Sequence, residues 1–122
     1  MLTRTIRLFL LLEGATFVIA SIIHGGALVD GYAHRQARIA ESIIAVVLLG
    51  GLALTWIVPR RTRSIALVAQ TLALVGTLMG VTAIALGVGP RTVPDIVYHV
   101  GIIIVLVWGL VVARRAKSEV TG

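Results

Sequence analysis

Apolar residues fill four long stretches of this chain, and short runs of polar, glycine and proline residues separate them. The stretches predict helices at about residues 7–27, 38–58, 64–88 and 94–113. Crossing a hydrocarbon core about 30 Å thick takes about 20 residues of helix. Short connections make neighbouring helices antiparallel. The pattern therefore predicts an all-α fold, an integral membrane up-down four-helix bundle in which residues 1–122 form a single domain.

The composition agrees with a membrane protein and excludes several functions. Mean hydropathy is +1.05, and only 13% of residues are charged, which leaves more apolar surface than a soluble domain of this size covers. The absence of cysteine excludes disulfides, thiolate metal sites and thiol redox chemistry. There is no nucleophile elbow, phosphate loop or zinc-protease helix. The sequence thus favours a binding, transport or structural role over an enzymatic one.

The net charge of +6 is unevenly distributed. Between the stretches, basic residues gather on one side of the membrane, where both termini and the 59–63 turn lie, and few lie on the other. The first set is Arg4, Arg7, Arg60, Arg61, Arg63, Arg114, Arg115 and Lys117, and the second is Arg35, Arg38 and Arg91. The positive-inside rule then predicts cytoplasmic termini, in a multi-pass protein of a bacterial inner membrane. Because no aromatic-basic platform accompanies these charges, the lipid bilayer is the expected partner, and nucleic acid is not.

Small residues recur along one face of the third stretch, alternating by four and three positions. They are Ala69, Ala73, Gly76, Gly80, Ala83 and Gly87. Small residues let membrane helices approach closely. This small-residue seam predicts a close helix contact, either within the bundle or across a homo-oligomer interface.

Polar side chains within the stretches are few, and burying them in lipid is costly, so each is a candidate for function. His24, Glu41 and His99 each lie about one turn from the outer end of their helices. With Tyr98 and Asp95 at the same level, they predict a polar ligand-binding cluster near the outer leaflet. Two imidazoles and a carboxylate can hold a ligand head, relay protons, or bind a divalent metal or haem.

Each member of this cluster also has a structural explanation. His24 can reach the headgroups, and Glu41 suits the start of a helix, where a negative charge is stabilised. Asp95 lies three residues after Thr92, the spacing of a helix N-cap. The metal or haem interpretation lacks the close histidine spacing typical of such sites, so the cofactor is left open.

A second polar pair is predicted in the inner half. Glu13 and Gln70 lie at similar distances from the cytoplasmic ends of their helices. They can form a buried interhelical hydrogen bond. Glu13 can alternatively serve as a proton-binding group.

Four spans with one glutamate early in the first resemble the small multidrug resistance transporters, a likeness confined to topology and Glu13. It implies proton-coupled transport of a small molecule at Glu13. The two outer segments, residues 31–41 and 89–99, are more similar to small four-helix bacterial membrane proteins, a resemblance that implies no activity. Three hypotheses remain: a ligand-binding or accessory protein with the outer polar pocket, a transporter using Glu13, and a structural subunit of a larger membrane complex.

Overall fold

The computed structural model describes residues 2–116, and in that range the chain is helical with no strand. Its elements are α1 (Leu2–His24), α2 (Arg35–Ile57), a 3-10 turn η1 (Pro59–Arg61), α3 (Thr62–Ala85) and α4 (Val93–Arg115). The predicted all-helical, four-helix fold is confirmed. Lys117, counted above among the basic residues, lies outside the described residues.

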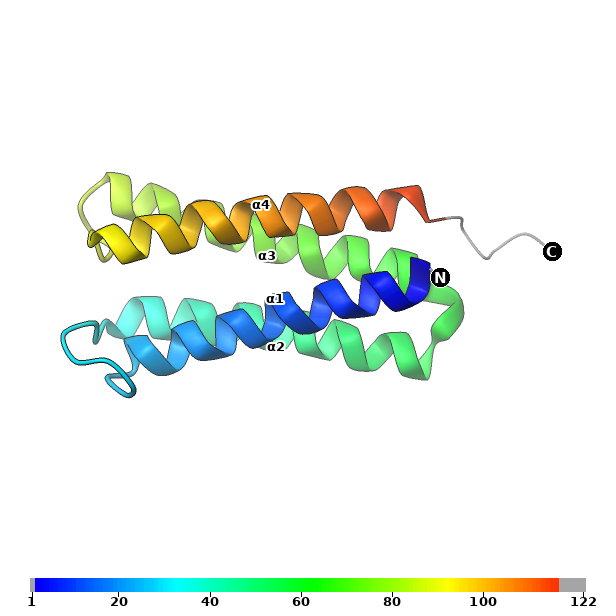
Figure 1. Cartoon of the computed structure of the whole chain (residues 1–122), viewed down its shortest axis with the longest axis horizontal. Helices are drawn as coiled ribbons and strands as arrows, with labels where there is room; N and C mark the ends of the chain where they lie inside the picture. The colour runs from blue at the N-terminus through cyan, green and yellow to red at the C-terminus, as the bar shows by residue number, and fades with distance from the viewer. Residues whose placement is uncertain (1, 117–122) are drawn as a thin grey trace.

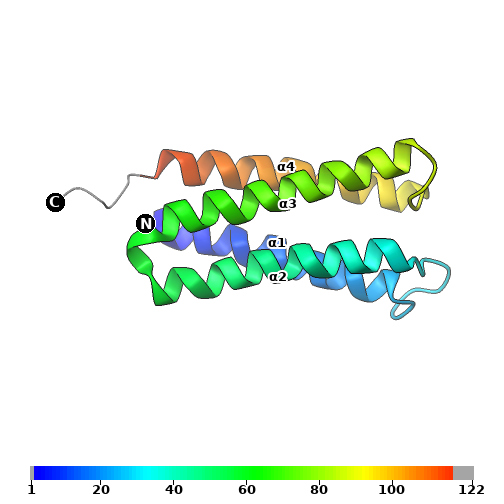
Figure 2. The ribbon, with the colours of Figure 1, turned by 180° about the vertical axis from the view of Figure 1, so that it is seen from behind.

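The helices run up and down along one axis (Figure 1). Around the bundle, α1 contacts α2 and α4, and α3 contacts the same two helices, whereas no Cα atom of α2 comes within 8 Å of α4. We call the end with the α1–α2 and α3–α4 connections the loop end (Figure 2). The opposite end, with η1 and the start of α1, is called the terminal end.

Helix boundaries differ from the prediction where local hydrogen bonds decide them. α1 begins at Leu2 instead of residue 7 and ends at His24 instead of residue 27, because Gly26 turns the chain with φ 92°. α2 begins three residues early, since Nδ1 of His34 accepts a hydrogen bond from the Ala37 amide at 3.2 Å. α3 ends at Ala85, so Gly87, expected on the helical seam, lies in the following turn with φ 80°.

Apolar side chains cover both the inside and the outside of the bundle. Leu10, Leu48 and Leu106 are fully buried in its core. Val46 and Met79, by contrast, point outward and are about 70% exposed, at 71% and 69%. All four helices are long and apolar enough to cross a membrane. Exposed apolar surface of this extent is unfavourable in water and marks contact with lipid or a partner, which indicates a multi-pass membrane protein.

The small-residue seam of α3 has two environments. Toward the terminal end, Ala69 and Ala73 are buried, and a Cβ added at Gly51 of α2 would lie 3.0 Å from that of Ala69. Toward the loop end, Gly76 still lies close to Ile44 of α2, with 3.0 Å between an added Cβ and Cδ1 of Ile44, but Gly76 and Gly80 also line a cavity between α2 and α3. The seam therefore joins the helices over one half and leaves space over the other.

Candidate functional site

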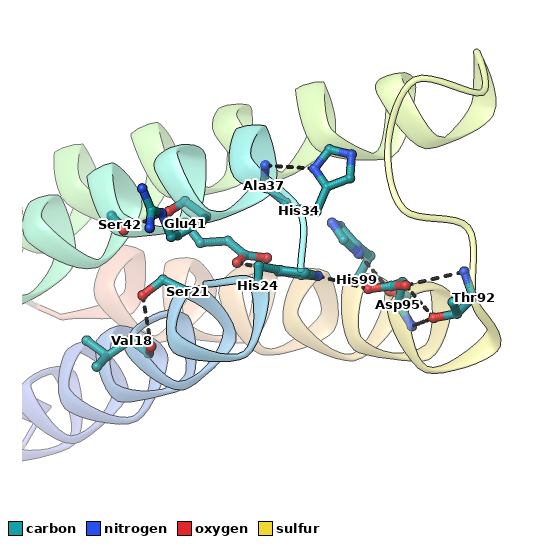
Figure 3. Close-up of polar contacts among 11 residues, drawn as sticks. Val18, Ser21, His24, His34, Ala37, Glu41, Ser42, Thr92, Asp95 and His99 are labelled. Carbon is teal, nitrogen blue, oxygen red and sulfur yellow. Dashed lines mark hydrogen bonds and ion pairs between the residues drawn. The ribbon is translucent and has the colours of Figure 1, made fainter. Parts of the chain in front are cut away.

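His24, the last residue of α1, joins three helices at the loop end. Its Nδ1 lies 2.7 Å from Oε2 of Glu41 on α2, and its Nε2 lies 3.1 Å from Oδ1 of Asp95 on α4 (Figure 3). Each of the three residues is only 5% exposed. We call this arrangement the carboxyl–imidazole chain: Glu41, His24 and Asp95.

Local structure at the ends of α1 and α4 holds this chain in place. Asp95 uses its two oxygens differently: Oδ2 contacts the Thr92 hydroxyl and amide in a capping box, while Oδ1 faces His24. The backbone carbonyl of His24 accepts a hydrogen bond from the His34 amide at 2.8 Å, which ties the loop to the end of α1. The carboxylate interpreted from sequence as a cap is therefore both a cap and a partner of histidine.

His99 belongs to the same level but not to the chain. Its Nδ1 lies 2.7 Å from the backbone carbonyl of Asp95. A carbonyl only accepts hydrogen bonds, so Nδ1 carries the hydrogen, and Nε2 of the neutral ring is left as an acceptor. A Cβ at Gly80 would lie 3.4 Å from this Nε2. The predicted grouping of His24, Glu41 and His99 is thus formed in part: Asp95, not His99, is the second partner of His24.

Two cavities reach the carboxyl–imidazole chain from opposite sides of the bundle. The α2–α3 cavity, of about 550 Å³, has mostly apolar walls and includes Glu41, His99 and Thr77. The α1–α4 cavity, of about 380 Å³, includes His24, Asp95 and Tyr98. Both volumes fall in the range of small-molecule sites. One end of the chain therefore lies at each cavity.

Tyr98 lies against the aromatic side chains of its neighbours. Its ring packs edge-on against Phe17 of α1 and against His99, with centroids 6.1 and 5.2 Å apart. Its hydroxyl oxygen is buried and has no hydrogen-bond partner within residues 2–116. A buried hydroxyl without a partner is energetically costly, and this oxygen is not itself exposed to the α1–α4 cavity that Tyr98 lines.

Metal or haem ligation finds little support in this geometry. Within residues 2–116, no group of three His, Cys, Asp or Glu side chains is arranged to hold a metal ion. Both ring nitrogens of His24 already face carboxylates. An iron between His24 and His99 would require one of these contacts to break.

The second predicted pair, Glu13 and Gln70, lies in the core. Nε2 of Gln70 donates to both carboxyl oxygens of Glu13, at 3.1 and 3.2 Å, and both residues are 0% exposed. Space for the pair comes from Gly109 of α4, where an added Cβ would lie 2.3 Å from Nε2 of Gln70. Sequence reasoning missed Gly109, although a glycine interrupting the apolar run of the last helix was a visible signal.

Sequence reasoning also missed an anchor at the terminal end. Nε of Arg7 donates to the hydroxyl of Thr55 at 3.1 Å, and Nη2 donates to its carbonyl at 2.7 Å. The Arg7 guanidinium also lies 3.8 Å from the centre of the Trp56 ring. The sequence indicates Arg7 only as a basic residue that sets membrane orientation, whereas in the structure its side chain joins α1 to α2.

No protein-family model, curated protein or solved structure matches this chain. The carboxyl–imidazole chain and its two cavities are the features on which a function can be built. They combine buried ionisable groups with space for a ligand, the usual composition of a binding site.

Proposed function

We propose that this is a multi-pass protein of a bacterial inner membrane whose α2–α3 cavity binds a lipophilic molecule with a hydrogen-bond-donating, cationic head group, such as an alkylammonium. The excess of basic residues at the terminal end supports a cytoplasmic location for both termini. The loop end, with both cavities, then lies toward the outer leaflet.

The observation that carries this proposal is a set of three acceptors in the α2–α3 cavity, on Glu41, His99 and Thr77, although His34 and Gln36, which also line it, can donate hydrogen bonds. Within residues 2–116, Oε1 of Glu41 forms no hydrogen bond, and Nε2 of His99 is left as an acceptor. The Thr77 hydroxyl donates its hydrogen to the Ala73 carbonyl at 2.7 Å. A head group that donates hydrogen bonds fits this set, while the apolar walls suit a hydrocarbon tail.

The charge of the carboxyl–imidazole chain also favours a cation. Its two hydrogen bonds require two protons between His24 and the two carboxyl groups. With two protons, the chain carries one net negative charge, whether His24 is an imidazolium or one carboxyl group is protonated. An unbalanced charge is unfavourable away from water, and a bound cation would balance it.

Binding of octylammonium to the full chain in phosphatidylcholine nanodiscs tests the proposal, with octanol as the uncharged analogue. We expect saturable binding of octylammonium that Glu41→Gln weakens at least about tenfold, the loss of a charge-assisted hydrogen bond. Gly80→Leu should also weaken binding, because it fills the cavity beside His99. Gly101→Leu is the matched control, since nothing lies within 4 Å of a Cβ at Gly101.

Two outcomes would contradict the proposal. Equal affinity for octanol and octylammonium would mean that charge is not recognised. Unchanged affinity in both Glu41→Gln and Gly80→Leu would place the ligand elsewhere.

The alternative, a proton-coupled transporter using Glu13, has less support. Glu13 is fully buried beside Gln70 and lines neither of the two cavities. Proton-driven movement of a cation in liposomes that Glu13→Gln abolishes would favour it. Co-purification with a fixed partner, and no small-molecule binding, would favour a structural subunit.

A further inference from the structure

We infer that the α1–α4 cavity is a second site for the same class of cation, and that the two cavities compete for the single negative charge that the carboxyl–imidazole chain carries. This inference rests on the proposed function, because it takes the ligand class from the α2–α3 cavity. It adds a second site and a coupling between the two.

The second cavity has its own polar groups. Asp95, His24 and Tyr98 line it. The Asp95 carboxylate can accept a hydrogen bond from an ammonium group and balance its charge. Ile19 and Ile23 supply apolar walls for a hydrocarbon tail.

His24 is the element that couples the cavities. Its two ring nitrogens face one carboxyl group each, at 2.7 and 3.1 Å. A shift of the protons along these two hydrogen bonds moves the negative charge from Glu41 to Asp95 without moving any heavy atom. A cation beside Glu41 therefore draws the charge into the α2–α3 cavity, and a cation beside Asp95 draws it into the α1–α4 cavity.

His99, whose charge would act on Glu41, leaves this count of charges unchanged when its ring is neutral. Within residues 2–116, the structure has two ion pairs, and both are formed by His24, one with Glu41 and one with Asp95. Arg35, Arg38 and Arg91 lie at the same end, but their side chains are exposed and pair with neither carboxylate. His99 is bound to the Asp95 carbonyl through Nδ1. Two bound cations would thus leave one positive charge unbalanced in an apolar site, and the second should bind weakly.

The test measures both affinity and stoichiometry of octylammonium with the full chain in phosphatidylcholine nanodiscs. The wild-type protein should bind one molecule tightly and a second at least about tenfold more weakly, within the usual range of coupling between sites. Gly80→Leu should remove one site and leave one molecule bound in the α1–α4 cavity. Thr16→Leu, which fills that cavity from α1, should remove the other.

The double variant should bind none, and the control Ala15→Leu, at an exposed neighbouring position, should behave as wild type. Loss of all binding in Gly80→Leu alone would overturn the second site and leave the proposed function standing. Two molecules bound with equal affinity would overturn the competition. No binding to the wild-type protein would refute the proposed function itself.

Discussion

Gly109 of α4 provides the sharpest test of the core, because it makes room for the pair of Glu13 and Gln70. A Cβ at this position would lie 2.3 Å from Nε2 of Gln70 and 2.5 Å from Oε1 of Glu13, whereas ordinary contact begins at 3.4 Å. In Gly109→Ala, the two side chains must therefore retreat by about 1 Å, the difference between 3.4 and 2.3 Å. Their present hydrogen bonds, 3.1 and 3.2 Å long, must then be lost or re-formed in a displaced position.

The expected cost combines two terms. An interhelical hydrogen bond in a membrane contributes about 0.6–1.7 kcal/mol, and overpacking a closed core costs about 1–3 kcal/mol. Some of the strain relaxes when the bonds break, so the terms overlap and do not add fully. We expect Gly109→Ala to lower the free energy of unfolding by about 2 kcal/mol.

Reversible unfolding in mixed micelles, followed by circular dichroism, measures this loss. Gly101→Ala on the same helix is the control, since a Cβ there meets nothing within 4 Å. A second background carries both Glu13→Leu and Gln70→Leu, which removes the polar atoms that clash with the added methyl group. In this background, Gly109→Ala should lower the free energy of unfolding by less than about 0.5 kcal/mol. The same loss in both backgrounds, or equal stability of Gly109→Ala and Gly101→Ala, would refute the reasoning.

Three further predictions concern topology and the two ends of the bundle. Because the chain contains no cysteine, single cysteines can be introduced at the exposed positions by Ser64→Cys and Gln36→Cys. In intact cells, an impermeant maleimide should label Gln36→Cys and not Ser64→Cys. Labelling of Ser64→Cys from outside the cell would show that the orientation is the reverse. Thr92→Ala should cost about 1 kcal/mol of unfolding free energy, the value of an N-cap, and unchanged stability in micelles would show that the capping box adds nothing. Arg7→Lys should lower the free energy of unfolding by about 1 kcal/mol in the same assay, because an ammonium cannot form both hydrogen bonds to Thr55 and also stack on Trp56. Unchanged stability would mean that Arg7 contributes only its charge.

The four-helix fold was predictable because a lipid environment leaves few solutions. A hydrophobic stretch long enough to cross the membrane must close its own backbone hydrogen bonds, and a helix does so. Helix ends were less predictable because single groups decide them. Examples are the His34 side chain at the start of α2 and the positive φ of Gly26 after α1.

The candidate site was only partly accessible from sequence. Depth along the helices placed His24 and Glu41 at one level, and the structure brings them into contact. Depth along a helix fixes neither the rotation of the helix about its axis nor the rotamer of a side chain. The hydrogen bond from His99 to the Asp95 carbonyl could therefore not be predicted. The binding role of these residues stays a prediction. The α2–α3 cavity lies beside the α3 seam and the other cavity lies between α1 and α4, and both depend on how the helices pack and not on their sequences alone.

The contacts of α1 bear on the order in which the chain assembles. Arg7, Glu13 and His24 each form side-chain hydrogen bonds to other helices, and together they reach α2, α3 and α4. The helix synthesised first therefore carries three polar groups whose partners are made later. Synthesis of α2 supplies Thr55 and Glu41, and α3 then supplies the amide of Gln70. The last partner, Asp95, is supplied by α4, so the carboxyl–imidazole chain is complete only after all four helices have been synthesised.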